Sequence, residues 1–117
     1  MATKLEKSIW RPYFDSMSKI LAGKRAEIEV AALDLGDQIE AEWAPLIGIT
    51  YDQKNDLIEV ALEGVDHLIN RPREVWVEAE GQNLSSIEIV DANGDRQIIT
   101  LKDPLMLPAP PQVKKAG

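Results

Sequence analysis

The side chains best suited to proton transfer and anion binding lie close together in one connecting segment, residues 64–73. His67 is the single histidine of the chain, and Asp66 directly precedes it. Arg71 and Arg73 flank a proline a few residues later. An imidazole exchanges protons near neutral pH, and guanidinium groups bind carboxylates or phosphates through paired hydrogen bonds. Four residues therefore form a candidate ligand-binding site: Asp66, His67, Arg71 and Arg73.

The surroundings of His67 argue against catalysis. No typical nucleophile lies nearby, and the chain has no cysteine. If Asp66 begins a short helical turn, it caps that turn, because neighbouring residues on a helix do not face each other. We assign no catalytic residue and favour a protein that is not an enzyme. We also expect no cofactor and no metal site, since glycine-rich phosphate loops, paired-histidine zinc motifs and EF-hand loops are all missing.

Trp76 is the second feature with a possible binding role. It alternates with Val75 and Val77, and therefore shares the hydrated side of its strand with Glu74 and Glu78. A large ring on that side is either covered by the helix or the tail, or exposed as a contact residue. We name Trp76, Glu74 and Glu78 as a candidate interface.

The charge distribution restricts the choice of partner. The chain has a net charge of −7, although its first 25 residues are mainly basic. An acidic body disfavours nucleic acid, whose binding depends on lysine and arginine neutralising phosphates. We expect a second copy of the chain or another protein as partner, while a simple solvated surface remains the alternative. Six glutamates lie on the hydrated side of their strands and converge if those strands are neighbours: Glu27, Glu29, Glu40, Glu42, Glu59 and Glu63.

One amphipathic helix is predicted over residues 11–22. Trp10, Phe14, Met17 and Leu21 recur at spacings of three and four, which places them on one face. Gly23 follows the predicted end, where a left-handed residue is preferred. We expect this helix to pack on a sheet.

Strand-like alternation of apolar and charged residues follows, within residues 24–101. The connections are too short for crossover helices, so the strands are expected to be antiparallel. The segment 91–95 contains Asn-Gly, a strong hairpin signal. Its register has two alternatives, because a two-residue turn sets Ile89 opposite Ile98, whereas a glycine bulge sets Ile87 opposite Ile99.

These elements predict an α+β fold, with the N-terminal helix packed on a curved antiparallel meander of six or seven strands. The sheet is either open or closed as a small barrel. Residues 1–107 form one domain, and residues 108–117 form a proline-rich flexible tail. No apolar stretch reaches the length of a membrane span and no signal peptide is present, so we expect a cytoplasmic protein without membrane contact.

Several short motifs resemble those of an uncharacterised bacterial family of unknown function. They include Leu33-Asp34-Leu35-Gly36-Asp37, Leu46-Ile47-Gly48-Ile49, Leu62-Glu63-Gly64-Val65-Asp66-His67-Leu68-Ile69 and Pro72-Arg73-Glu74. The similarity covers most of the chain and implies a bacterial, single-domain protein. It implies no activity, cofactor or catalytic residue. The predicted architecture also resembles Sm-like and SH3-like small barrels, but fold likeness alone does not transfer RNA binding.

Overall fold

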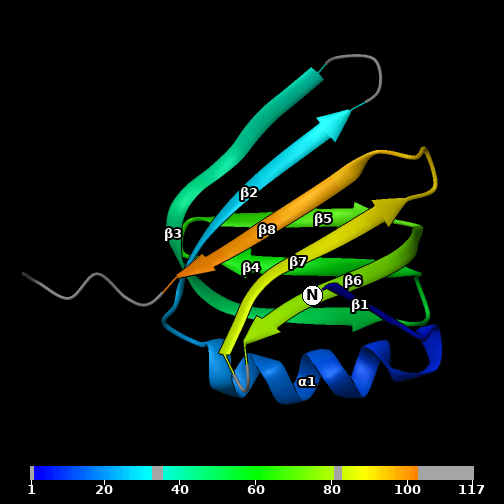
Figure 1. Cartoon of the computed structure of the whole chain (residues 1–117), viewed down its shortest axis with the longest axis horizontal. Helices are drawn as coiled ribbons and strands as arrows, with labels where there is room; N and C mark the ends of the chain where they lie inside the picture. The colour runs from blue at the N-terminus through cyan, green and yellow to red at the C-terminus, as the bar shows by residue number, and fades with distance from the viewer. Residues whose placement is uncertain (1, 33–35, 81–82, 103–117) are drawn as a thin grey trace, which may run out of the picture.

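A computed structural model describes residues 2–32, 36–80 and 83–102 (Figure 1). In chain order the elements are β1 (Ala2–Leu5), the 3-10 helix η1 (Lys7–Ile9), α1 (Trp10–Leu21), β2 (Arg25–Ala32), β3 (Gly36–Asp52), β4 (Leu57–Leu62), β5 (Val65–Asn70), β6 (Pro72–Glu80), β7 (Asn83–Asp91) and β8 (Arg96–Lys102). All strand pairs are antiparallel. The strand order is β1-β6-β7-β8-β2-β3-β4-β5.

The sheet folds over on itself into two layers. In Figure 1, β1, β6, β7, β8 and β2 cross in front of β4, β5 and the second half of β3. The inward residues of both layers form the core, in which Ile28, Ile58, Ile87 and Ile99 have no exposed surface. The two end strands, β1 and β5, are not paired with each other, so the predicted alternative of a closed barrel is wrong.

β3 belongs to both layers. Its first half pairs with β2 and its second half with β4. The strand bends around Trp43, which has a left-handed φ of 49°, and contains an irregularity between Leu46 and Gly48. Because of this irregularity Ile47 points to solvent, with 62% of its surface exposed. The alternating stretches 38–43 and 47–51 are therefore parts of one bent strand.

The predicted helix is confirmed, with α1 one residue earlier at each end than residues 11–22. Trp10, Phe14 and Leu21 are buried as the spacing predicts. The helix packs against the second half of β3, and the Ser18 hydroxyl bonds both the N–H and the C=O of Ile49. One side chain thus satisfies backbone groups that a neighbouring strand would otherwise pair with.

The prediction of six or seven strands is wrong, because the described residues form eight. Two strands were missed. β1 is only four residues long and mostly polar, so its alternation is too short to detect. β5 occupies the segment 65–70, where a helical turn capped by Asp66 was predicted.

The hairpin between β7 and β8 adopts the second predicted register, with Ile87 opposite Ile99. Gly94 has a φ of 85° and its N–H bonds the carbonyl of Asp91 at 2.9 Å. The glycine is required here because this left-handed conformation strains other residues. The predicted tail, residues 108–117, and the end of the predicted domain lie outside the described residues.

Candidate functional site

The predicted pair of Asp66 and His67 is divided between the two faces of β5. Successive residues of a strand point to opposite sides. Asp66 pairs with Ala61 and is exposed, whereas His67 pairs with the core residue Val60 and is half-buried. The carboxylate of Asp66 therefore does not orient the imidazole of His67.

His67 instead belongs to a polar chain that connects the two layers. Its Nε2 is hydrogen-bonded to Oε1 of Gln97 on β8, and Gln97 Nε2 donates to Oδ2 of Asp91 at 3.0 Å. Since the amide oxygen of Gln97 can only accept, the imidazole N–H is the donor. Oδ1 of Asp91 also accepts the backbone N–H groups of Asn93 and Asp95. We call Asp91, Gln97 and His67 the interlayer cluster.

The two predicted arginines lie at the start of β6. Both are exposed, and Arg71 has a left-handed φ of 49° with its N–H bonded to the carbonyl of Asp56 at 2.9 Å. Neither Arg71 nor Arg73 lines either of the two cavities that the structure describes. Among the described residues, Asp66, His67, Arg71 and Arg73 line neither of these two cavities.

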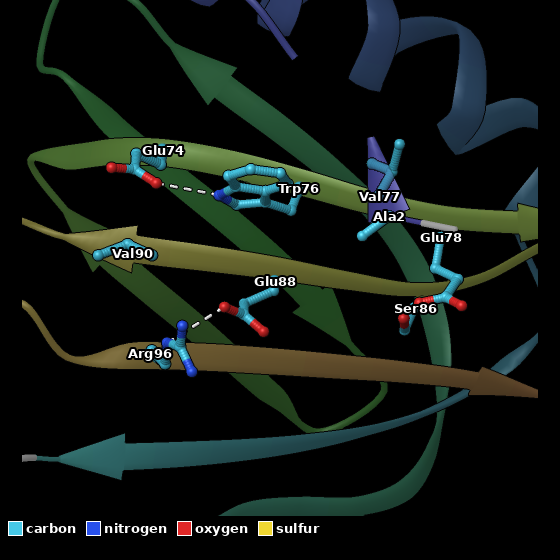
Figure 2. Close-up of a pocket in the computed structure, with 9 residues that line it drawn as sticks. All are labelled: Ala2, Glu74, Trp76, Val77, Glu78, Ser86, Glu88, Val90 and Arg96. Atoms are coloured by element: carbon cyan, nitrogen blue, oxygen red, sulfur yellow. Dashed lines mark hydrogen bonds and ion pairs between the residues drawn. The ribbon is translucent and has the colours of Figure 1, made fainter. Parts of the chain in front are cut away.

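A cavity of about 300 Å³ lies instead on the outer surface of the front layer (Figure 2). It is an open groove over β6, β7 and β8, bordered by Ala2 at the start of β1. Its lining includes all three residues of the predicted interface. The groove residues are Ala2, Glu74, Trp76, Val77, Glu78, Ser86, Glu88, Val90 and Arg96.

The strand register explains why these residues meet. Trp76 lies directly opposite Glu88 on β7, and Lys4 of β1 lies opposite Trp76 on its other side. Directly opposed residues on one face have Cβ atoms about 5 Å apart. The half-buried Trp76 ring thus forms one wall of the groove, and Glu88 lies beside it near the centre (Figure 2).

In the groove, the Glu74 carboxylate accepts a hydrogen bond and the Glu88 carboxylate is paired with a cation. Trp76 Nε1 donates to Glu74 Oε1 at 3.0 Å, and Arg96 Nε lies 3.3 Å from Glu88 Oε2 (Figure 2). The Lys4 ammonium lies 5.9 Å from the centre of the Trp76 ring, at the outer limit of a cation–π contact. The groove thus already holds two cations of its own chain at its edges.

The electrostatics of the groove suit binding rather than proton transfer. The hydrogen bond from Trp76, followed by the charge of Lys4, lowers the pKa of Glu74 below its ordinary value. Glu74 therefore stays ionised near neutral pH and is a poor general acid. The three carboxylates of the lining outnumber the Arg96 guanidinium and the Lys4 ammonium at the edge, so the groove is negatively charged with an aromatic wall, which fits a cationic or amphipathic partner.

Comparisons with known proteins agree with the resemblance seen in the sequence. Residues 1–110 match the model of a family of unknown function, DUF5335. The chain belongs to this family. A relative from Aquifex aeolicus (strain VF5), named "Uncharacterized protein", is 43% identical over 110 residues, which cover 92% of this chain and 99% of the relative. No solved structure matches the chain at a significant level.

In this DUF5335 chain, a second cavity of about 450 Å³ lies beside α1 and the turn between β3 and β4. Its lining includes Arg11, Asp15, Asp52 and Lys54, whose opposite charges are interspersed. Tyr51 also borders it, and burial, followed by the hydrogen bond to Asp56, raises the pKa of its phenol to about 12. This cavity has neither a single sign of charge nor an exposed ring, and we assign it no ligand.

Two further findings concern only the part of the DUF5335 chain that the structure describes. None of its helices is long and apolar enough to cross a membrane. No group of three or more histidine, aspartate or glutamate side chains there is placed to hold a metal ion.

Sequence reasoning found three groove residues and missed the others. Glu88 and Arg96 were missed because their place beside Trp76 depends on the pairing of β7 with its two neighbours. Once the hairpin register is chosen, Glu88 lies outward between the inward residues Ile87 and Ile89, so the signal was present. Ala2 and Lys4 were missed because β1 was not predicted.

Proposed function

We propose that this protein is a non-enzymatic interaction module that binds a positively charged segment of a partner protein in the groove around Trp76. The observation that carries the proposal is the combination of a half-buried tryptophan with Glu74, Glu78 and Glu88 in one open groove. Tryptophan is enriched at binding hot spots, and complementary charge selects the partner.

The geometry supports binding of a protein segment better than binding of a small molecule. The groove is open and lies on a sheet surface, whereas small-molecule sites usually enclose most of their ligand. Trp76 offers a large, rigid contact area, and its indole N–H is already hydrogen-bonded, so a partner need not satisfy it. The position of Lys4 near the ring supports binding of a basic side chain there.

The test uses a fluorescein-labelled octapeptide that alternates lysine and threonine, measured by fluorescence anisotropy against one that alternates glutamate and threonine. We expect only the lysine peptide to bind, and more weakly as salt is raised, since exposed charges are screened. Trp76→Ala should weaken binding more than tenfold and Glu88→Gln about fivefold. Glu63→Gln, the same change on an exposed glutamate just beyond β4, is the matched control.

Two results would contradict the proposal. One is equal affinity of the protein for both peptides. The other is unchanged binding of the lysine peptide by Trp76→Ala, provided that the circular dichroism of the variant shows a folded protein. The site can also be located by NMR, because the chain has only three tryptophans and the Trp76 indole signal can be assigned from Trp76→Phe.

A further inference from the structure

The strand that borders the groove, β1, is weakly held. It forms one end of the sheet and pairs only with β6, over four residues. Ala2, Thr3 and Lys4 are exposed, and only Leu5 is buried. Segments with few buried apolar contacts open at low free energy.

Leu5 is the point at which β1 is anchored. Its side chain belongs to the core, and its carbonyl accepts the indole N–H of Trp10 at 3.1 Å. Residues 2–4 can therefore leave β6 without exposing a core side chain. The structural loss is then a few hydrogen bonds to β6, each worth about 1 kcal/mol, and the contact of Lys4 with the Trp76 ring.

β6 offers more edge than β1 covers. β6 has nine residues, of which only Val75 to Glu78 are paired with β1. An uncovered strand edge is a ready template for another extended chain. A strand longer than β1 can pair along more of β6 and still place alternate side chains over the groove.

We propose that the partner binds as an extended strand that replaces residues 2–4 of β1 along β6, with a lysine or arginine over Trp76. The inference rests on the proposed function and specifies how the partner binds. In this view residues 2–4 of β1 occupy the place of the partner strand, because Lys4 already lies opposite Trp76 within a cation–π distance. A partner strand with a second basic residue in the place of Ala2 also matches the carboxylate of Glu78, which Ala2 faces in the register.

A reversible cross-link tests whether β1 must leave. Thr3 and Val77 are directly paired, and such pairs have Cα separations that accept a disulfide. The natural chain has no cysteine, so Thr3→Cys combined with Val77→Cys can form only this bond within one molecule. The same lysine–threonine octapeptide is titrated against the oxidised and the reduced protein.

We expect the reduced protein to bind the peptide at least tenfold more tightly than the oxidised protein. Equal affinities of the two forms would overturn strand replacement and leave the groove as a binding site. Absence of binding to the natural protein as well would overturn the proposed function itself. The two failures are therefore distinguishable.

A second variant reports on the same step without a cross-link and without changing charge. Leu5→Ala weakens the anchor of β1, and we expect it to increase affinity for the octapeptide about fivefold, because a competing segment of the chain is released. Leu62→Ala, which truncates a core leucine of β4, is the control and should leave the affinity unchanged. An unchanged affinity in Leu5→Ala would contradict the proposal.

Discussion

The hairpin β7–β8 contributes residues to two polar clusters, which face opposite sides of the sheet. The interlayer cluster points inward, where Asp91 and Gln97 keep only 7% and 8% of their surface exposed. The pair of Glu88 and Arg96 points outward into the groove, where the side chains keep 32% and 64% of theirs. Both clusters join a carboxylate to an N–H donor, and they differ in solvent access and in the charge of that donor, which is a neutral amide inside and a guanidinium outside.

This difference assigns the clusters to different tasks. A buried polar group that loses its hydrogen-bond partner destabilises the folded state, because it has no water to bond instead. The hydrogen bonds of the interlayer cluster therefore support the fold. An exposed ion pair contributes little to stability, and water or another cation can replace either member. The outer pair can therefore be exchanged for contacts with a partner without unfolding the protein.

The largest effect on stability is expected from Asp91→Ala. The substitution leaves three donors without their acceptor: the N–H groups of Asn93 and Asp95 and the amide of Gln97. We expect a loss of about 3 kcal/mol in the free energy of unfolding, measured by urea denaturation.

Asp52 provides a matched control for this loss. It accepts the N–H groups of Lys54 and Asn55 in the exposed turn between β3 and β4, in the manner of Asp91. Because water can replace its bonds, Asp52→Ala should lower the free energy of unfolding much less than Asp91→Ala does. Equal losses in the two variants would show that burial is not what separates the clusters.

A smaller loss is expected from His67→Phe. The phenyl ring keeps the packing between the layers but removes the N–H that bonds to Gln97, so the buried Oε1 of Gln97 loses this donor. We expect the free energy of unfolding to fall by about 1–2 kcal/mol. Asp66→Ala changes the adjacent, exposed side chain and should have an effect within about 0.5 kcal/mol. A larger loss in Asp66→Ala than in His67→Phe would refute the structural role of the imidazole.

The sequence predicts the helix and most strands well because their burial is periodic. Trp10, Phe14 and Leu21 follow helical spacing, and the alternation around Ile58 and Ile87 follows strand spacing. A strand of four residues does not contain enough alternation to be recognised, which is why β1 was missed.

The candidate sites show a different limit of prediction from the sequence. Proximity in sequence placed Asp66 and His67 in one candidate ligand site, but a strand sends neighbouring side chains to opposite faces. The true neighbour of His67, Gln97, lies 30 residues away and in the other layer. The inward position of Gln97 could have been inferred, since this residue alternates with Ile99 and Leu101. That β5 packs against the layer of β8 could not, because it depends on the bend of β3. Glu74, Trp76 and Glu78 could be grouped from the sequence because a single strand, β6, contains all three.

The smallest effect on stability is expected in the groove, where a pKa is the sharper measurement. Glu74 has a pKa below its ordinary value of 4.5, first because Trp76 donates to it and then because Lys4 is near. Its contribution to stability is therefore present above about pH 4.5 and is lost as the pH falls through the lowered pKa. Trp76→Phe should raise this pKa, and Lys4→Met should raise it less, as followed by NMR titration of the Glu74 carboxyl carbon. Both variants should remain far more stable than Asp91→Ala, since the groove is hydrated and its ion pairs contribute little. If Trp76→Phe instead destabilised the protein as strongly as Asp91→Ala, Trp76 would be a structural residue, and the contrast between an inward cluster for folding and an outward groove for binding would fail.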